Sequence, residues 1–215
     1  MSDGTPYRFI AVEGPIGAGK STLARKLSVT FNSLLLREMA EENPFLARFY
    51  KDRAGNALAT QLFFLFQRAR QLEDLPKDDL FSTSMVSDFL IDKDRLFAKL
   101  NLDNNEFDLY QQVYHKLRLQ APTPDLVIYL QANPNELLHR IKSRAIPYEQ
   151  SIDVQYLEAL NAAYSEFFHY YDDAPLLIVN AGAIDFANNE NHYSQLVEYL
   201  SKVRSGRQYF NPTFF

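Results

Sequence analysis

The chain has 215 residues, a formal net charge of −5 and no cysteine. Its length suits one α/β domain with a full hydrophobic core, so we expect residues 1–215 to form a single domain. The lack of cysteine excludes disulfides and thiolate metal sites, and the acidic balance argues against a nucleic-acid partner. No stretch approaches the roughly 18 apolar residues of a membrane span, and residues 1–5 do not resemble a secretory signal. We therefore expect a cytoplasmic protein with no membrane partner.

The first element is a predicted strand that leads into a glycine-rich loop. Residues 7–13 are mostly apolar, and residues 14–21 read Gly-Pro-Ile-Gly-Ala-Gly-Lys-Ser. This is the complete G-x-x-x-x-G-K-[ST] pattern of a phosphate-binding loop, and residues 22–27 have the composition of a helix. A strand, a loop and a helix in this order favour a working phosphate site over a glycine-rich turn with an incidental lysine.

The residue types in this loop suit a nucleotide triphosphate. Glycines let backbone N–H groups turn toward phosphate oxygens, and the N-terminus of the following helix adds partial positive charge. Lys20 is expected to reach the β- and γ-phosphates of ATP, and Ser21 to ligate Mg²⁺. The residues expected to bind ATP are Gly14, Pro15, Ile16, Gly17, Ala18, Gly19, Lys20, Ser21 and Thr22.

Four further strand candidates follow along the chain, at 33–37, 83–88, 125–130 and 175–179, with helical stretches between them. The longest predicted helix lies near 152–172, where apolar residues recur with a helical period. This alternation predicts an α/β fold with a five-stranded parallel sheet and helices on both faces. Ligands of such sheets bind at the carboxyl ends of the strands, so the residues just after each strand are candidates for the site.

Two acidic residues occupy such positions. Glu38 follows the second predicted strand, where it is expected to take the proton of a substrate hydroxyl or to help hold Mg²⁺. A solvated acidic loop is the alternative for Glu38. Asp88 ends the third predicted strand and is expected to reach Mg²⁺ directly or through water, although Asp at such a junction is also typical of a helix N-cap. The predicted metal ligands are therefore Ser21 and Asp88.

A predicted helix over 56–75 carries Gln61 and Arg68 within an apolar run. Residues seven apart lie on nearly the same helical face, where an amide and a guanidinium together suit the edge of a nucleobase. The alternative is an exposed polar stripe on an otherwise buried helix, and these residues taken alone favour that alternative.

The densest basic segment is 139–150, in which Arg140 and Arg144 are spaced i, i+4. Such a pair is expected to project together and to close over a triphosphate. A solvated basic face is the common alternative. The four histidines have no metal-ligand spacing, so no zinc site is expected.

Taken together, these motifs resemble the deoxyribonucleoside kinase family from Ile10 to about Leu200. The resemblance implies a P-loop kinase fold with a short arginine-bearing lid at about 140–150, which is expected to be mobile, and a homodimer formed through helices. It also implies transfer of the ATP γ-phosphoryl group to the 5′-hydroxyl of a deoxynucleoside, with Mg²⁺ as cofactor. The residues that it assigns to catalysis are Glu38, Lys20, Arg140 and Arg144.

The same resemblance implies an acceptor site. Gln61 and Arg68 match the family's base-reading residues, which reverses the preference for an exposed stripe on their helix. Tyr50 and Glu149 match residues that contact the sugar 3′-hydroxyl. The residues expected to bind the acceptor are Glu38, Tyr50, Gln61, Arg68, Asp88, Asp94 and Glu149.

The chain departs from the family pattern after its third strand. The family usually continues Asp/Glu-Arg-Ser there, whereas this chain reads Asp88-Phe89-Leu90. Lys93 and Arg95 are the two alternatives for the missing cation. Residues 86–98 and 206–212 look like a bacterial branch of deoxyadenosine/deoxyguanosine kinases. A purine deoxynucleoside is therefore the expected acceptor, with Asp94 as a candidate base contact.

Two other functions share parts of these motifs. A thymidylate or other nucleoside monophosphate kinase has the same donor chemistry but needs extra cations beside the acceptor phosphate. A GTPase-type binding switch needs an Asn-Lys-x-Asp guanine motif, and this chain contains no Asn-Lys pair. Both alternatives are weaker than a deoxynucleoside kinase.

Overall fold

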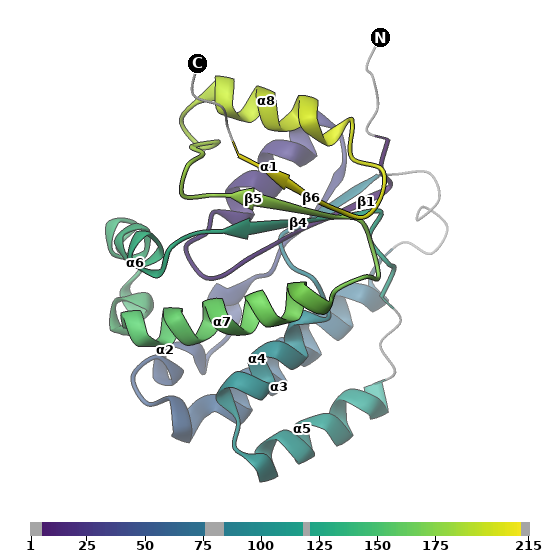
Figure 1. Ribbon diagram of the computed structural model, residues 1–215. Helices are drawn as coiled ribbons and strands as arrows, with labels where there is room; N and C mark the ends of the chain where they lie inside the picture. The colour runs from purple at the N-terminus through teal and green to yellow at the C-terminus, as the bar shows by residue number, and fades with distance from the viewer. Residues whose placement is uncertain (1–5, 76–83, 118–120, 212–215) are drawn as a thin grey trace.

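The computed structural model describes residues 6–75, 84–117 and 121–211, and its centre is a single twisted sheet (Figure 1). All the strand pairs are parallel, and the strand order is β2-β3-β1-β4-β5-β6. The strands are β1 Phe9–Glu13, β2 Leu34–Leu36, β3 Met85–Ser87, β4 Leu126–Gln131, β5 Leu176–Asn180 and β6 Arg207–Phe210. The predicted α/β class with a parallel sheet is therefore confirmed.

Helices cover both faces of this sheet (Figure 1). One face carries α1 and α8, and the other carries α7, α4 and α3, with α5 outside them. The short α2 and the helix α6 lie near the carboxyl ends of the strands. The helices are α1 Lys20–Thr30, α2 Leu46–Phe49, α3 Arg53–Glu73, α4 Lys93–Asn101, α5 Asn104–Leu117, α6 Pro134–Ser143, α7 Val154–Tyr170 and α8 Glu190–Leu200, with 3₁₀ turns at Ala40–Glu42 and Pro147–Ser151.

The prediction of five strands was wrong by one, because β6 pairs in parallel with β5 at the edge of the sheet. This strand has no apolar run that marks it in the sequence. Arg207 and Tyr209 are exposed, and only Phe210 is buried, where its ring packs 5.2 Å from that of Tyr199. The other five strands lie where they were expected, within two residues at each end, although residue 83 of the third prediction is outside the described residues.

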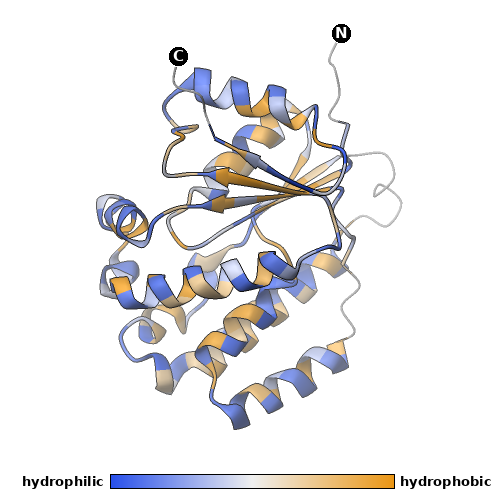
Figure 2. Cartoon of the chain, viewed as in Figure 1, coloured by the Kyte–Doolittle hydropathy of each residue, from blue (hydrophilic) through white to orange (hydrophobic). Residues whose placement is uncertain are grey.

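The sheet centre is apolar because helices exclude water from both of its faces (Figure 2). Ile10, Ala11 and Val12 of β1 are at most 1% exposed, and residues 126–130 of the neighbouring β4 are at most 2% exposed. Glu13 ends β1 and is 0% exposed, so a carboxyl group lies within the most buried part of the sheet. A charge at such a position requires partners, since an isolated ion there loses its hydration.

The loops that follow the strands lie together at the carboxyl edge of the sheet, as is usual for parallel sheets. The phosphate-binding loop joins β1 to α1, and its backbone accepts only glycine at two points. Gly14 has φ +150°, and a Cβ there would lie 2.5 Å from the carbonyl oxygen of Leu130. Gly19 has φ +101°, and its Cβ would lie 2.8 Å from the Phe186 ring. The loop is therefore held between β4 and the segment after β5.

Among the described residues, no helix is long and apolar enough to cross a membrane. The expectations of a single domain over 1–215 and of a cytoplasmic location stay predictions.

Candidate active site

Two cavities flank the phosphate-binding loop. The first cavity is lined by residues that follow β1, β2 and β3, by residues of α3 and by the lid segment at about 140–150. Its polar lining includes Lys20, Ser21, Thr22, Glu38, Tyr50, Gln61, Arg68, Asp88, Lys93, Arg144 and Glu149. The second cavity lies on the other side of the loop; its lining includes Gly17, Gly19, Thr22, Arg140, His192 and residues 182–188. The two cavities share Gly17, Gly19 and Thr22, so the loop separates them.

Lys20 lies across the phosphate-binding loop at the start of α1. Its ammonium donates hydrogen bonds to the carbonyl oxygens of Gly14 (2.7 Å) and Pro15 (3.2 Å). Burial lowers the pKa of Lys20, and the positive charge of Lys93 lowers it further. An anionic phosphate reverses both effects, because it supplies the negative charge that this buried ammonium lacks.

Glu38 lies between two buried cations. The Arg68 guanidinium donates through Nη2 to Oε1 of Glu38, and the Lys93 ammonium donates to Oε2 at 2.8 Å. Burial alone would raise the pKa of Glu38, but the charges of Lys93 and Arg68 hold it well below its usual range. Glu38 is therefore an ionised hydrogen-bond acceptor at any ordinary pH.

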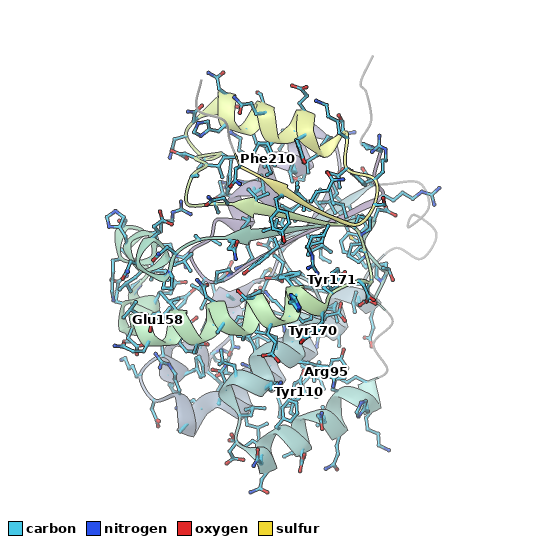
Figure 3. All side chains as sticks on the ribbon, in the orientation of Figure 1. Arg95, Tyr110, Glu158, Tyr170, Tyr171 and Phe210 are labelled. Carbon is cyan, nitrogen blue, oxygen red and sulfur yellow. The ribbon has the colours of Figure 1, made fainter. Side chains whose placement is uncertain are left out.

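The structure distinguishes the two alternatives for the missing third-strand cation. Lys93 is 2% exposed and its ammonium lies against Glu38. Arg95 is exposed, and its guanidinium lies 6.0 Å from the centre of the Tyr114 ring, on the outer side of α4 (Figure 3). Lys93 is the first residue of α4, and Arg95 lies two residues later, about half a helical turn away. The two side chains therefore lie on opposite sides of α4, and that of Lys93 points inward.

Arg68 joins Glu38 to a second buried carboxylate. Its Nη1 donates to Asp94, whose other oxygen accepts a hydrogen bond of 2.8 Å from the Tyr110 hydroxyl. Gln61 is 3% exposed and lines the same cavity. The rings of Phe64 and Phe97 also line it. Buried amide, guanidinium and carboxylate groups beside aromatic rings are suited to bind a flat polar ring.

Asp88 lies beside the phosphate-binding loop and beside Glu38. Its Oδ1 accepts a hydrogen bond of 2.6 Å from the backbone N–H of Glu38, which fixes the end of β2 against the end of β3. The described residues contain no cluster of three or more His, Cys, Asp or Glu side chains with metal-binding geometry. Mg²⁺ in phosphoryl-transfer sites needs only one or two protein oxygens besides phosphates and water. Ser21 and Asp88, which line one cavity, fit that requirement.

The lid segment holds its two arginines in different cavities. Arg144 forms a two-point pair with Glu149, through Nε to Oε2 (2.7 Å) and Nη2 to Oε1 (2.6 Å), at the first cavity. Arg140 donates to the carbonyl oxygen of Ala181 (2.7 Å) and lines the second cavity. Helix α6 ends at Ser143, so Arg144 is no longer inside a regular helix and the expected joint projection is absent.

Tyr50 lies beneath this lid. Its ring is stacked on Tyr148, with centroids 6.4 Å apart and planes 1° from parallel. Burial raises the pKa of Tyr50, and the charge of Glu149 raises it further, so the hydroxyl stays protonated. The structure thus brings Tyr50 and Glu149 to one wall of the first cavity, where both were expected.

The sequence prediction missed the role of Glu13 in this site. Its Oε1 accepts hydrogen bonds from the Gly14 N–H and the Tyr164 hydroxyl, both 2.8 Å long. Its Oε2 accepts a 2.8 Å bond from the Leu90 N–H and lies 3.6 Å from the Lys93 ammonium. The available signal was a single acidic residue at the end of an apolar strand, directly before the first loop glycine.

Comparisons with known proteins identify relatives over most of the chain. The family model described as deoxynucleoside kinase matches residues 10–204. The deoxyguanosine kinase of Bacillus subtilis (strain 168) is 34% identical over 91% of this chain and 97% of that protein. The deoxyadenosine/deoxycytidine kinase of the same organism is 26% identical over 91% and 92% of the two chains.

A solved structure has the same fold. It is that of deoxyadenosine kinase from M. mycoides with bound dATP, which matches with a TM-score of 0.76 and 29% sequence identity. The match covers 89% of this chain and 98% of that one.

The hydrogen bond from Tyr164 to Glu13 gives a prediction for stability. Tyr164→Phe removes a donor to a buried carboxylate, so we expect the free energy of unfolding to fall by about 1–3 kcal/mol. Urea denaturation at neutral pH measures this change. Tyr171→Phe is the matched control, because the buried Tyr171 hydroxyl has no hydrogen-bond partner among the described residues. Equal stability of Tyr164→Phe and wild type would contradict the account of Glu13.

Proposed function

This chain belongs to the deoxynucleoside kinase family and is a kinase, and we propose that it transfers the γ-phosphoryl group of ATP to the 5′-hydroxyl of a purine deoxyribonucleoside. The observation that carries this proposal is the composition of the first cavity. Lys20 of the phosphate-binding loop, the ionised Glu38 and the buried pair of Gln61 and Arg68 line one continuous space. They fit a donor phosphate, an acceptor hydroxyl and a flat polar base, respectively.

The donor is proposed to lie across both cavities. Residues 14–22 bind its phosphates through backbone N–H groups, the N-terminus of α1 and the Lys20 ammonium. The second cavity takes the adenosine part, with Arg140 beside it and Phe186 against the loop. Arg140 therefore contributes to donor binding, while Arg144 is the lid residue that faces the transferring group.

The acceptor is proposed to fill the first cavity. Gln61 and Arg68 are buried polar groups that line this cavity with the Phe64 ring, and they bind the edge of the base. Asp94 does not line the cavity, and it is proposed to act with them through its ion pair to Arg68. Tyr50 and Glu149 hold the sugar 3′-hydroxyl. This assignment is supported by the place of both side chains in the lining of the first cavity.

The chemical step is an in-line displacement at the γ-phosphorus. A bond forms between the acceptor O5′ and phosphorus, and the bond from phosphorus to the bridging oxygen breaks, with its electron pair leaving on ADP. The O5′ proton passes to the Glu38 carboxylate. Mg²⁺, for which Ser21 and Asp88 are the proposed ligands, neutralises charge on the β- and γ-oxygens when bound. Lys20 and Arg144 supply fixed positive charge beside the same oxygens.

Two observations bear on the choice of acceptor. The relative named deoxyguanosine kinase shares more identity with this chain than the one named deoxyadenosine/deoxycytidine kinase, which supports a purine and makes deoxycytidine the competitor to test. A nucleoside monophosphate is a poorer fit, because the ionised Glu38 beside the acceptor end would repel its 5′-phosphate.

A groove on the outer side of α4 and α7 supports the proposal that two copies of this chain form a homodimer. Its apolar lining is Leu96, Leu100, Phe107, Ala159, Ala162, Ala163, Phe167, Tyr170 and Tyr171. Arg95, Tyr170 and Tyr171 lie close together on this side of the molecule (Figure 3). Tyr170 is 76% exposed, and a large exposed ring beside an apolar groove is typical of an interaction surface.

The first test is a panel of acceptors with ATP at a fixed concentration. We expect ADP release with deoxyguanosine or deoxyadenosine to exceed that with deoxycytidine, thymidine and the deoxynucleoside monophosphates.

In Glu38→Gln the same reaction should lose about 10²–10³ in kcat, because the carboxamide does not accept the O5′ proton. Preferred turnover of a monophosphate, or wild-type kcat in Glu38→Gln, would contradict the proposal.

The groove gives a prediction for assembly. Ala162 is exposed within it, so Ala162→Arg places an unpaired charge at the proposed interface and should yield a protein of half the native mass by light scattering. Val29→Arg is the control, because Val29 is 78% exposed at the end of α1 on the opposite face of the sheet. A wild-type monomer, or a dimeric Ala162→Arg, would refute this interface.

A further inference from the structure

Lys93 is a buried lysine between two carboxylates. Its side chain is 3% exposed, and its ammonium lies 2.8 Å from Oε2 of Glu38 and 3.6 Å from Oε2 of Glu13. Removing an ammonium from water costs several kcal/mol, and two carboxylates offset that cost. Lys93 is the first residue of α4, which places its side chain at the carboxyl ends of the strands beside Glu38.

Lys93 also belongs to the reaction space. It lines the first cavity together with Lys20 and Glu38. Its charge reaches the phosphate-binding loop, since Lys93 is the largest cause, after burial, of the lowered pKa of Lys20. Two ammonium groups that repel each other at one edge of a cavity are both stabilised by an anion bound between them.

Glu13 holds Lys93 from the side opposite to Glu38. Three hydrogen bonds, from the Gly14 N–H, the Leu90 N–H and the Tyr164 hydroxyl, fix the Glu13 carboxylate. Glu13 is thus tied at once to the phosphate-binding loop, to the segment before α4 and to α7. The lysine has a flexible four-carbon stem, so its ammonium is able to change partners while Glu13 stays in place.

We propose that Lys93 is a further catalytic residue, whose ammonium moves from Glu38 to the oxygens of the transferring phosphoryl group while Glu13 keeps it in position. This inference rests on the proposed kinase function and adds a residue to it. Lys93 forms no covalent bond in the step. The O5′–phosphorus bond forms, the bond from phosphorus to the bridging oxygen breaks with its electron pair leaving on ADP, and the O5′ proton goes to Glu38.

The movement of the Lys93 ammonium assists both the acceptor hydroxyl and the transferring phosphoryl group. Oε2 of Glu38 becomes free to accept a hydrogen bond from the O5′ hydroxyl once the Lys93 ammonium has left it. The ammonium meanwhile neutralises charge that spreads over the equatorial phosphoryl oxygens.

The test is steady-state kinetics of Lys93→Met with ATP and deoxyguanosine. We expect kcat to fall about 10²–10³-fold with KM for the acceptor within about threefold, because the contact is made only in the transition state. Lys116→Met, at an exposed position of α5, is the control for loss of a lysine charge.

A double variant separates catalysis from folding. Lys93→Met leaves Glu13 without its cation, whereas Glu13→Gln combined with Lys93→Met removes both charges of the pair and should be more stable than Lys93→Met by thermal denaturation. We expect the double variant to show the same loss of kcat. A folded variant of either kind with wild-type kcat would overturn the inference, provided that Glu38→Gln is inactive. If Glu38→Gln is also active, the proposed function itself fails.

Discussion

The carboxylate of Glu38 lies where three strands end, and its two ion pairs organise the rest of the site. Arg68 reaches it from α3 and Lys93 from α4, so the two helices that form one wall of the first cavity are tied to the end of β2. Each cation has a second carboxylate, Asp94 for Arg68 and Glu13 for Lys93. Removing Lys93 leaves Glu13 buried without its cation, and removing Arg68 does the same to Asp94, which is far more costly than losing an exposed pair.

This arrangement connects recognition to reaction. Arg68 touches the proposed base-binding residue Asp94 and also Glu38, so the same guanidinium borders the base site and the hydroxyl site. Glu13 connects the phosphate-binding loop to Lys93 through bonds made on the buried side of the sheet. The parallel sheet makes these connections short, because its strands bring distant parts of the chain to one edge.

The sequence was sufficient to predict the parts of the fold that depend on local pattern. The apolar runs of β1, β4 and β5, the glycine-rich loop and the long α3 and α7 are read directly from residue type and period, and the family assignment followed from their order. Edge strand β6 was missed because only Phe210 is buried in it. An open edge needs no continuous apolar run, so its sequence looks like that of a loop.

The site was predictable to the same extent. Glu38 was named from its place after a strand, whereas Tyr50 and Gln61 were named from the family resemblance, and the structure brings all three to one cavity. The choice between Lys93 and Arg95 depended on where α4 begins, which a sequence pattern fixes only within a few residues. The separation of Arg140 from Arg144 depended on where α6 ends, for the same reason. Helix ends are decided by caps and packing, and the periodicity that identifies a helix does not locate them.

The claim that Lys93 leaves Glu38 for the phosphoryl group is tested most directly by a crystal structure with ADP, Mg²⁺, deoxyguanosine and a planar metal fluoride in place of the transferring group. The account predicts the Lys93 ammonium within about 3 Å of a fluoride, and the deoxynucleoside O5′ on Oε2 of Glu38. A Lys93 ammonium that still lies between Glu13 and Glu38 in that complex would contradict it.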